Sequence, residues 1–317
     1  MTVRHLDEAT VARILTPAVA RDLMRRTLAA AARGEANGPV RSVLATAKGW
    51  FAAMPASVAM DGLDALGAKL VSFFPQNAAL ALPTHQAAIA MFDPASGAFV
   101  ALVEGETITE RRTAAVSVVA TERLALKPLG TLAILGAGVQ GFAHLEAFLD
   151  ARLVANVRIW SRTLASAERL ASRAREAGLA AFIAADPAAA VRGADVVVTA
   201  TSASEPLFAA ADITDGAHIN AVGACVPSRR ELPADLLAEA NVYVDSIDAT
   251  WQESGDLLLA VRDLGCEAIS IVDELGKMLV NPSLCHAARR VTIFESVGLG
   301  IEDVACAAYV MIEVARL

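Results

Sequence analysis

The first third of the chain starts with a helical pattern and then changes to short, strand-like segments. Apolar side chains recur at roughly helical spacing over residues 7–34, and Gly34 stands where such a helix would end. The apolar segments that follow are short and bounded by Gly, Pro and Asp, which is typical of strands. The expected strands are Val40–Thr46, Trp50–Met54, Ala68–Phe74, Ala87–Phe92 and Phe99–Val103. This part therefore predicts a mixed α+β domain.

A second change of pattern follows an alanine-rich segment, residues 107–126, that is expected to be helical. Apolar strands then alternate with helical segments, as in a parallel sheet built from βαβ units. The expected strands are Thr131–Leu135, Val157–Trp160, Val196–Thr199, His218–Val222 and Val242–Asp245. The predicted fold class is α/β, with a Rossmann-type doubly wound parallel sheet domain beside the mixed α+β domain. No Gly/Ser-rich or Pro-rich linker separates the two parts, so we expect a packed helix at their boundary.

Composition narrows the class of function. The 317 residues are enough for two domains, and 55% of them are hydrophobic, yet no uninterrupted apolar run is long enough to span a membrane. The net charge is −8 and the basic residues are scattered, which argues against a nucleic-acid or membrane partner. The N-terminus lacks a signal-peptide layout. Small-molecule chemistry is the expected role.

The four cysteines indicate a reducing compartment. They are Cys225, Cys266, Cys285 and Cys306, widely spaced and without a C-x-x-C pair. That spacing suggests neither a metal site nor a disulfide framework. We therefore expect a cytoplasmic protein with no bound metal.

A glycine motif directly follows the strand TLAIL. It consists of Gly136, Gly138 and Gly141, with Val139 and Gln140 opening the next helix. Glycines at these places permit a tight turn, close approach of a pyrophosphate and close helix–strand packing, while the helix N-terminus favours an anion. The strand before the motif and a second strand about 20 residues later are both in place. The motif therefore predicts dinucleotide binding.

The residues that end the second strand indicate which dinucleotide is bound. NAD enzymes carry an acidic residue here, whose charge would repel a 2′-phosphate. This chain has Ser161, Arg162 and Thr163 instead. An arginine can make paired, charge-assisted bonds to the extra phosphate. We therefore expect NADPH as cofactor, with NADH as the alternative.

A set of motifs in order along the whole chain resembles the ornithine cyclodeaminase and mu-crystallin family. The motifs are Arg41, MPA at 54–56, GAKLVSFFPQN at 67–77, TERRTAA at 109–115, ILGAGVQG at 134–141, HINAVGA at 218–224, ESGDLLL at 253–259 and FESVGLGIEDVA at 294–305. The resemblance implies a substrate-binding and dimerisation domain, residues 1–126 with about 296–317, a Rossmann domain over 127–295, and a homodimer.

The resemblance also assigns site residues. Arg41, Lys69 and Arg112 match the positions that hold a substrate carboxylate. Three cations from separate elements are costly to bring together unless an anion neutralises them, which supports that assignment. Thr84 and His85 match positions that approach the cofactor, and Val222 matches one that borders the nicotinamide. Thr201 follows the strand VVVTA, where it is expected to line the ribose.

Two departures separate this chain from the cyclodeaminases. Their aspartate in the loop after HINAVGA is replaced by Cys225, and their acidic residue before Met-Pro is replaced by Ala52. Burying the distal ammonium of ornithine without a partner would cost several kcal/mol. A thiol with a pKa near 8.5 is also a poor replacement for a carboxylate base. The ketimine-reductase members resemble this chain at both places and share the W-x-R-T pattern seen at 160–163.

The expected reaction is therefore reduction of a cyclic ketimine carboxylate, Δ1-pyrroline-2-carboxylate or Δ1-piperideine-2-carboxylate, to proline or pipecolate. Hydride transfer needs a short, aligned approach of cofactor and imine carbon, which the three cations would secure by holding the carboxylate. Lys69 is the expected proton donor, because cationic neighbours would lower its pKa. Cys225 is the second candidate, and it is equally well interpreted as a small apolar residue.

Three alternatives remain at this point. The first is NAD-dependent ornithine cyclodeamination, which Cys225, Ala52 and Arg162 disfavour. The second is oxidation of a simple amino acid such as alanine, which uses the same carboxylate contacts in reverse. The third is a non-catalytic ligand-binding protein of the mu-crystallin type.

Overall fold

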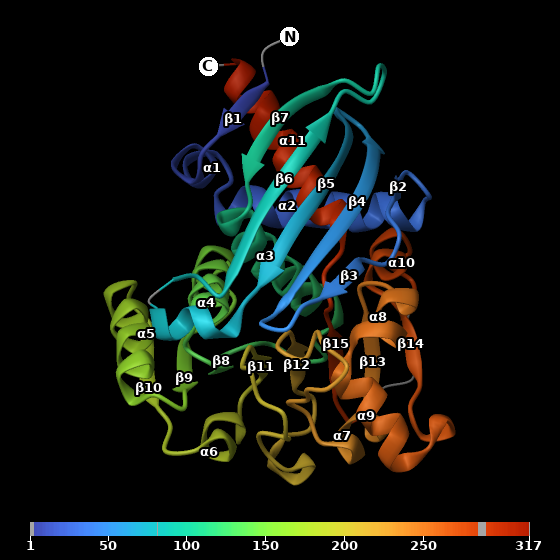
Figure 1. Ribbon diagram of the computed structural model, residues 1–317. Coiled ribbons are helices and arrows are strands. Elements are labelled where there is room, and N and C mark those ends of the chain that lie inside the picture. Colours follow the sequence, from blue (N-terminus) through green and yellow to red (C-terminus); the bar gives the residue numbers. More distant parts are fainter. Residues whose placement is uncertain (1–2, 81, 285–289, 317) are drawn as a thin grey trace. The chain divides into compact units, whose positions relative to one another are not determined.

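The structure is a computed structural model that describes residues 3–80, 82–284 and 290–316 (Figure 1). The chain divides into two compact units, Met1–Thr113 with Gly298–Leu317 (unit 1) and Ala114–Val297 (unit 2). Unit 1 thus joins the first third of the chain to its last helix. Among the described residues, no helix is long and apolar enough to cross a membrane.

Unit 1 is built on a seven-stranded sheet with the order β1-β7-β6-β5-β4-β2, and β3 pairs with β4. Neighbours pair antiparallel except β1 and β7. The strands are β1 (Arg4–Leu6), β2 (Ala36–Asn37), β3 (Ser42–Ala45), β4 (Trp50–Met60), β5 (Leu63–Phe73), β6 (His85–Phe92) and β7 (Phe99–Glu104). The expected mixed domain is confirmed, and β4 and β5 are longer than their patterns predicted because small residues interrupt their apolar alternation.

The helices of unit 1 pack on one face of this sheet. They are α1 (Glu8–Ile14), α2 (Pro17–Ala32) and α11 (Gly300–Arg316), with the 3₁₀ helix η1 (Pro75–Leu80) between β5 and β6. Helix α11 crosses the sheet and packs on β4, β5 and β6 (Figure 1). The single helix expected over residues 7–34 is wrong: Thr16 caps a new helix by accepting from the Val19 N–H, and Pro17 takes its first position.

Unit 2 contains an eight-stranded, fully parallel sheet with the order β10-β9-β8-β11-β12-β15-β13-β14. Its strands are β8 (Thr131–Leu135), β9 (Asn156–Trp160), β10 (Ala180–Ile183), β11 (Val196–Thr199), β12 (His218–Ala221), β13 (Asn241–Val244), β14 (Ile271–Glu274) and β15 (Thr292–Glu295). The predicted doubly wound sheet is confirmed. The sequence patterns missed β10, β14 and β15, which are only four residues long, and β14 and β15 also carry polar residues.

Helices cover both faces of the parallel sheet and bury two apolar clusters against it. They are α3 (Glu106–Leu124), α4 (Val139–Ala151), α5 (Leu164–Glu176), α6 (Pro187–Val191), α7 (Ala234–Glu239), α8 (Ile247–Glu253), α9 (Gly255–Leu264) and α10 (Leu275–Val280), with the 3₁₀ helices η2 (Ala210–Asp212) and η3 (Cys266–Ala268). Helices therefore link the strands, as βαβ units require.

Helix α3 crosses the division between the units. Its Arg112 pairs with Glu302 of unit 1, whereas Ala114 and Val118 belong to a core cluster of unit 2. We expected the boundary near residue 126, where the helix was predicted to end. The division falls earlier because a continuous helix can serve both cores, and it leaves no break in composition for a sequence pattern to reveal.

Candidate functional site

The glycine motif forms the turn from β8 into α4. Gly136 has φ +108°, and a Cβ there would collide with the carbonyl oxygen of Ala200, so only glycine fits. Gly138 is the N-cap of α4 without a side-chain capping bond, and apart from its own turn and helix no atom of the described residues lies within 4 Å of where its Cβ would be. The first N–H groups of α4 therefore lie beside an open space that a pyrophosphate would fill.

The remaining residues of the motif complete this arrangement. A Cβ on Gly141 would collide with the carbonyl oxygen of Gly136, so the glycine permits close packing of α4 on the turn. Val139, in the first turn of α4, is 61% exposed, which is unusual for a valine in a tightly packed unit. The residues of this unit thus fit a dinucleotide: a bare turn, an open helix N-terminus and an exposed apolar side chain beside it.

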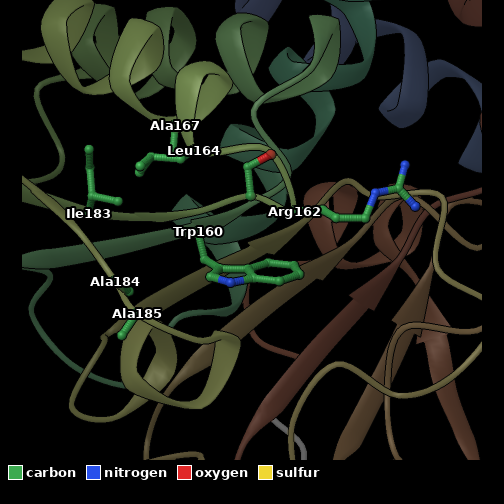
Figure 2. A pocket seen from close by; sticks show the side chains of 8 residues that line it. Trp160, Arg162, Leu164, Ala167, Ile183, Ala184 and Ala185 are labelled. Carbon is green, nitrogen blue, oxygen red and sulfur yellow. The ribbon is translucent and has the colours of Figure 1, made fainter.

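A pocket of about 490 Å³ opens at the ends of β9 and β10. Trp160, Ser161, Arg162, Leu164, Ala167, Ile183, Ala184 and Ala185 line it. Figure 2 shows the Arg162 guanidinium reaching away from Leu164 and Ile183, and Thr163 caps α5 without a side-chain bond. Within the described residues Arg162 has no acidic partner. The size and apolar walls of the pocket suit an adenine ring, and Arg162 supplies a cation at the rim of the pocket.

Thr201 and Val222 follow β11 and β12, which are neighbours in the parallel sheet. The Val222 N–H donates to the Thr199 carbonyl oxygen at 3.0 Å, so the two strand ends are joined by the backbone. In an open parallel sheet, ligands bind outside the carboxyl ends of the strands, at the point where the strand order reverses and the connections from two neighbouring strands run in opposite directions. Here that point lies between β8 and β11, next to the predicted residues.

Two of the three predicted carboxylate-binding cations belong to a buried charged cluster in unit 1. Lys69 lies on β5, is 2% exposed, and places its Nζ 3.0 Å from Asp303 Oδ1 on α11. Arg112 on α3 is ion-paired with Glu302, and its Nε lies 3.2 Å from Asp303 Oδ1. We call Lys69, Arg112, Glu302 and Asp303 the mixed-charge cluster.

Arg41 reaches the same cluster through the backbone of Gly298. Its Nη2 donates to the Gly298 carbonyl oxygen at 3.0 Å, and a Cβ on Gly298 would collide with the Arg112 guanidinium. The expected position of Arg41 within a strand is wrong, since β3 begins at Ser42. Arg41 and Arg112 therefore both contact Gly298, which has φ +79°, and the charges of both arginines act on Lys69.

The acidic members of the cluster change the expected charge balance of the site. The sequence suggested that these cations need a ligand anion, but Glu302 and Asp303 already neutralise Lys69 and Arg112. Both acids stand in the motif FESVGLGIEDVA, which was noted without assigning them a role. Burial lowers the pKa of Lys69 to about 8; the charges of Arg112 and Arg41 act in the same direction, and Asp303 opposes them. Burial thus contributes more than the cationic neighbours on which the prediction relied.

Thr84 and His85 lie side by side at the start of β6. The Oγ1 of Thr84 is 3.3 Å from His85 Nδ1, and the imidazole packs on Phe73 with ring centroids 4.5 Å apart. His85 is exposed. Neither side chain is therefore part of the buried core of unit 1.

The two positions that depart from the cyclodeaminases have no acidic character. Ala52 on β4 is fully buried in an apolar cluster with Met54 and Val71, bordered by Trp50 and Ala87. Cys225 is a half-buried free thiol in the segment after β12. Cys266 and Cys306 are also free, while Cys285 lies outside the described residues. The described residues contain no group of three side chains suited to a metal ion.

Known proteins with the same architecture carry related activities. Residues 3–316 match the model of the ornithine cyclodeaminase/mu-crystallin family. Ketimine reductase mu-crystallin of Mus musculus is 41% identical over 276 residues, which are 86% of this chain and 83% of that protein. An archaeal alanine dehydrogenase dimer with bound NAD has a TM-score of 0.92 at 27% identity, covering 100% of this chain and 97% of that one.

A further solved structure is Thermococcus litoralis Δ1-pyrroline-2-carboxylate reductase in complex with NADH and L-proline. It superposes with a TM-score of 0.93 at 29% identity, covering 99% of this chain and 98% of that one. The full-length family match and the 41% identity agree with the motifs and with both predicted sheets. The chain belongs to the ornithine cyclodeaminase/mu-crystallin family.

Proposed function

We propose that this protein reduces a cyclic ketimine carboxylate, Δ1-pyrroline-2-carboxylate or Δ1-piperideine-2-carboxylate, to L-proline or L-pipecolate. The observation that carries the proposal is the juxtaposition of buried cations and an apolar cluster on one face of the unit 1 sheet. Met54 lies opposite Lys69 in the β4–β5 register, and Ala52 lies opposite Val71. A ligand with one carboxylate and an apolar ring matches this combination of cationic and apolar side chains.

The same juxtaposition disfavours ornithine as substrate. Ala52 occupies the position where the cyclodeaminases have an acid, and its surroundings in the apolar cluster are Met54, Val71, Trp50 and Ala87. A second ammonium placed there would lose its hydration without gaining a partner. Oxidation of a small amino acid such as alanine uses the same carboxylate contacts, so we retain it as the second candidate and separate it by the direction and substrate of turnover.

In this proposal the chain's residues hold the substrate and supply one proton. Arg41 and Arg112 bind the carboxylate, and Lys69 donates a proton to the imine nitrogen as the C=N double bond is reduced. A bound nicotinamide cofactor would supply the hydride that forms the new C–H bond, becoming oxidised itself. With a pKa lowered to about 8 and still protonated at neutral pH, Lys69 is a stronger acid than an exposed lysine.

We propose NADPH as the preferred cofactor. The glycine turn and the N-terminus of α4 would hold the pyrophosphate. The pocket at the ends of β9 and β10 would hold the adenosine, and Ser161, Arg162 and Thr163 would lie beside the 2′-phosphate. Thr84, His85, Thr201 and Val222 remain proposed contacts to the rest of the cofactor. Cys225 is the second candidate for the proton donor, and we propose Lys69 ahead of it, with the half-buried thiol serving as a small apolar residue.

We also propose a homodimer formed through the sheet of unit 1. The face opposite α11 exposes a continuous set of apolar side chains: Leu44, Phe51, Leu66, Leu70, Phe99 and Leu102. An exposed apolar face of this extent is typical of a protein interface. Light scattering would report a monomer for a Leu66→Asp/Leu70→Asp variant and a dimer for the parent chain. A monomeric parent chain would contradict the proposal.

We propose the cytoplasm as the compartment, in keeping with the free cysteines.

The experiment that tests the function measures initial rates of NADPH and NADH oxidation with both cyclic ketimines, beside ornithine with NAD and alanine with NAD or NADP. We expect NADPH-dependent ketimine reduction, no proline or ammonia from ornithine, and little oxidation of alanine. Arg162→Ala should lower the preference for NADPH over NADH by about 10- to 100-fold, the loss of one or two charge-assisted bonds. Proline and ammonia from ornithine, or inactivity on every substrate, would contradict the proposal.

A further inference from the structure

Two buried carboxylates in unit 2 hold the backbone beside the proposed nicotinamide position. The side chain of Glu231, in the segment between β12 and α7, is fully buried. Its Oε1 accepts from the Thr201 N–H at 2.6 Å and its Oε2 from the Gly223 N–H at 2.9 Å. One carboxylate therefore joins the segment after β11 to the segment after β12.

A second carboxylate fixes the first. Asp256 on α9 is also fully buried, and its Oδ1 accepts from the backbone N–H groups of Glu231 and Leu232 at 2.7 and 2.8 Å. Gly255 precedes it, and a Cβ there would collide with the carbonyl oxygen of Arg229. The start of α9 thus lies directly against the segment that presents Glu231.

The glycines around this pair allow the segments to pack closely. A Cβ on Gly223 would lie 2.5 Å from the Thr201 carbonyl oxygen and would collide with the Glu231 carboxylate. On the other side, a Cβ on Gly136 would lie 3.1 Å from Thr201 Cγ2. The pyrophosphate turn, the end of β11 and the end of β12 are therefore in successive contact, and Glu231 connects the last two.

The order of the strands says which half of a dinucleotide would meet these segments. The adenosine would lie at the end of β9 and the pyrophosphate at the turn after β8, so the other half must extend over β11 and β12. We propose that Glu231, held by Asp256, is a positioning residue that fixes the Thr201 and Gly223 segments for the nicotinamide half of the cofactor. This inference rests on the proposed function, because it presumes a nicotinamide dinucleotide.

The chain offers a matched control at the opposite edge of the same sheet. Asp195 precedes β11, and its Oδ2 accepts from the N–H groups of Gly130 and Thr131 at 2.9 Å each. It joins the amino ends of β8 and β11 as Glu231 joins the carboxyl ends of β11 and β12. Both residues are carboxylates that accept two backbone N–H groups, but only Glu231 adjoins the predicted cofactor residues.

The test measures binding by calorimetry with two probes, NADPH and 2′-phospho-ADP-ribose, which lacks the nicotinamide. Glu231→Gln keeps the shape but turns one acceptor into a donor facing an N–H. We expect this variant to lower the affinity for NADPH at least about tenfold and the affinity for 2′-phospho-ADP-ribose less than about twofold. The reason is that a hydrogen bond to a charged group is lost only beside the nicotinamide half of the cofactor. Asp195→Asn should change the two affinities by the same small factor.

Glu231→Asp provides the same comparison if Glu231→Gln does not fold, because the shorter side chain keeps the charge and withdraws from one N–H. An equal loss of affinity for both probes, or no loss for either, would overturn the inference. Binding needs no turnover, so an incorrect substrate assignment leaves the test intact. A parent chain that binds neither probe would overturn the proposed function and this inference with it.

Discussion

Each unit of this protein buries a cluster of ionisable side chains, and the two clusters differ in their balance of charge. The mixed-charge cluster of unit 1 sets Lys69 and Arg112 against Glu302 and Asp303. The cluster of unit 2 contains only carboxylates, Glu231, Asp256 and Glu295, whose charges act on one another. Ion pairing compensates burial in the first cluster, whereas the second relies on N–H and O–H donors.

The difference shows in the direction of the pKa changes. Burial raises the pKa of Asp256 to about 7 and those of Glu231 and Glu295 as well, because each charge would lie in a poorly solvated interior beside other acids. Burial lowers the pKa of Lys69 to about 8. A cluster with cations can receive a carboxylate, while a carboxylate cluster organises backbone N–H groups. This contrast supports the proposals that the first cluster binds the substrate and that the second positions the backbone.

Removing the ammonium of Lys69 should have the largest effect. Lys69→Met keeps the length of the side chain, and we expect kcat with a cyclic ketimine to fall by about 10²- to 10⁴-fold, the usual contribution of a general acid, while affinity for NADPH changes little. The buried Asp303 loses its lysine, so unfolding free energy should also fall, by roughly 3–5 kcal/mol.

The double variant Lys69→Met/Asp303→Asn separates these two effects. It removes a buried positive and a buried negative charge together, so stability in urea unfolding should recover while kcat stays low. If activity recovered with stability, Lys69 would be structural and the contrast between the clusters would fail.

The pH dependence of the parent enzyme tests the next largest effect. Lys69 donates only while protonated, so kcat/KM should decrease as the pH rises through about 8, approaching a tenfold loss per pH unit above it. Lys69→Met should lack this decrease. A decrease of the same form in both proteins would assign it to the imine substrate instead.

Within the carboxylate cluster, Asp256 should have its main effect on stability. The pKa of Asp256 is raised in the folded state, so its contribution to stability is complete below its unfolded pKa of about 3.8 and is lost as the pH rises through about 7. Glu231 repels its charge and Arg230 attracts it, and the charges of Asp256 and Glu295 also repel one another. Asp256→Asn should therefore gain stability relative to the parent between pH 5 and pH 8, measured by urea unfolding. A difference independent of pH would show that this cluster does not titrate there.

Cys225 lies outside both clusters and should matter least. Cys225→Ala keeps a small side chain, and we expect kcat and KM to change by less than about threefold, as for a pocket residue without a chemical role. A loss comparable to that of Lys69→Met would identify the thiol as the proton donor.

Much of the fold could be predicted from sequence, because the signals were local. The strand TLAIL, the three glycines and the start of α4 at Val139 are where the pattern placed them. The break at Pro17 and strands such as β15 were missed, since short elements with polar ends have no periodicity. The identity of the family came from motifs spread over the whole chain.

The site could be predicted only in part from the sequence, because its charge balance depends on residues far apart in the chain. Lys69 and Asp303 are separated by 234 positions, and nothing local marks Asp303 as the partner of a lysine. Glu231 and Asp256 were likewise hidden, although ESGD was noted as a motif. Burial creates their roles, and single-sequence patterns do not reveal which acids are buried.

The most direct test of the central claim follows a label from cofactor to product. The parent enzyme would be given Δ1-piperideine-2-carboxylate and NADPH carrying deuterium at both C4 positions, and the product analysed by mass spectrometry and NMR. We predict L-pipecolate with one deuterium at the α-carbon and a solvent proton on nitrogen. Oxidation of the cofactor without deuterium at that carbon, or no pipecolate, would contradict it.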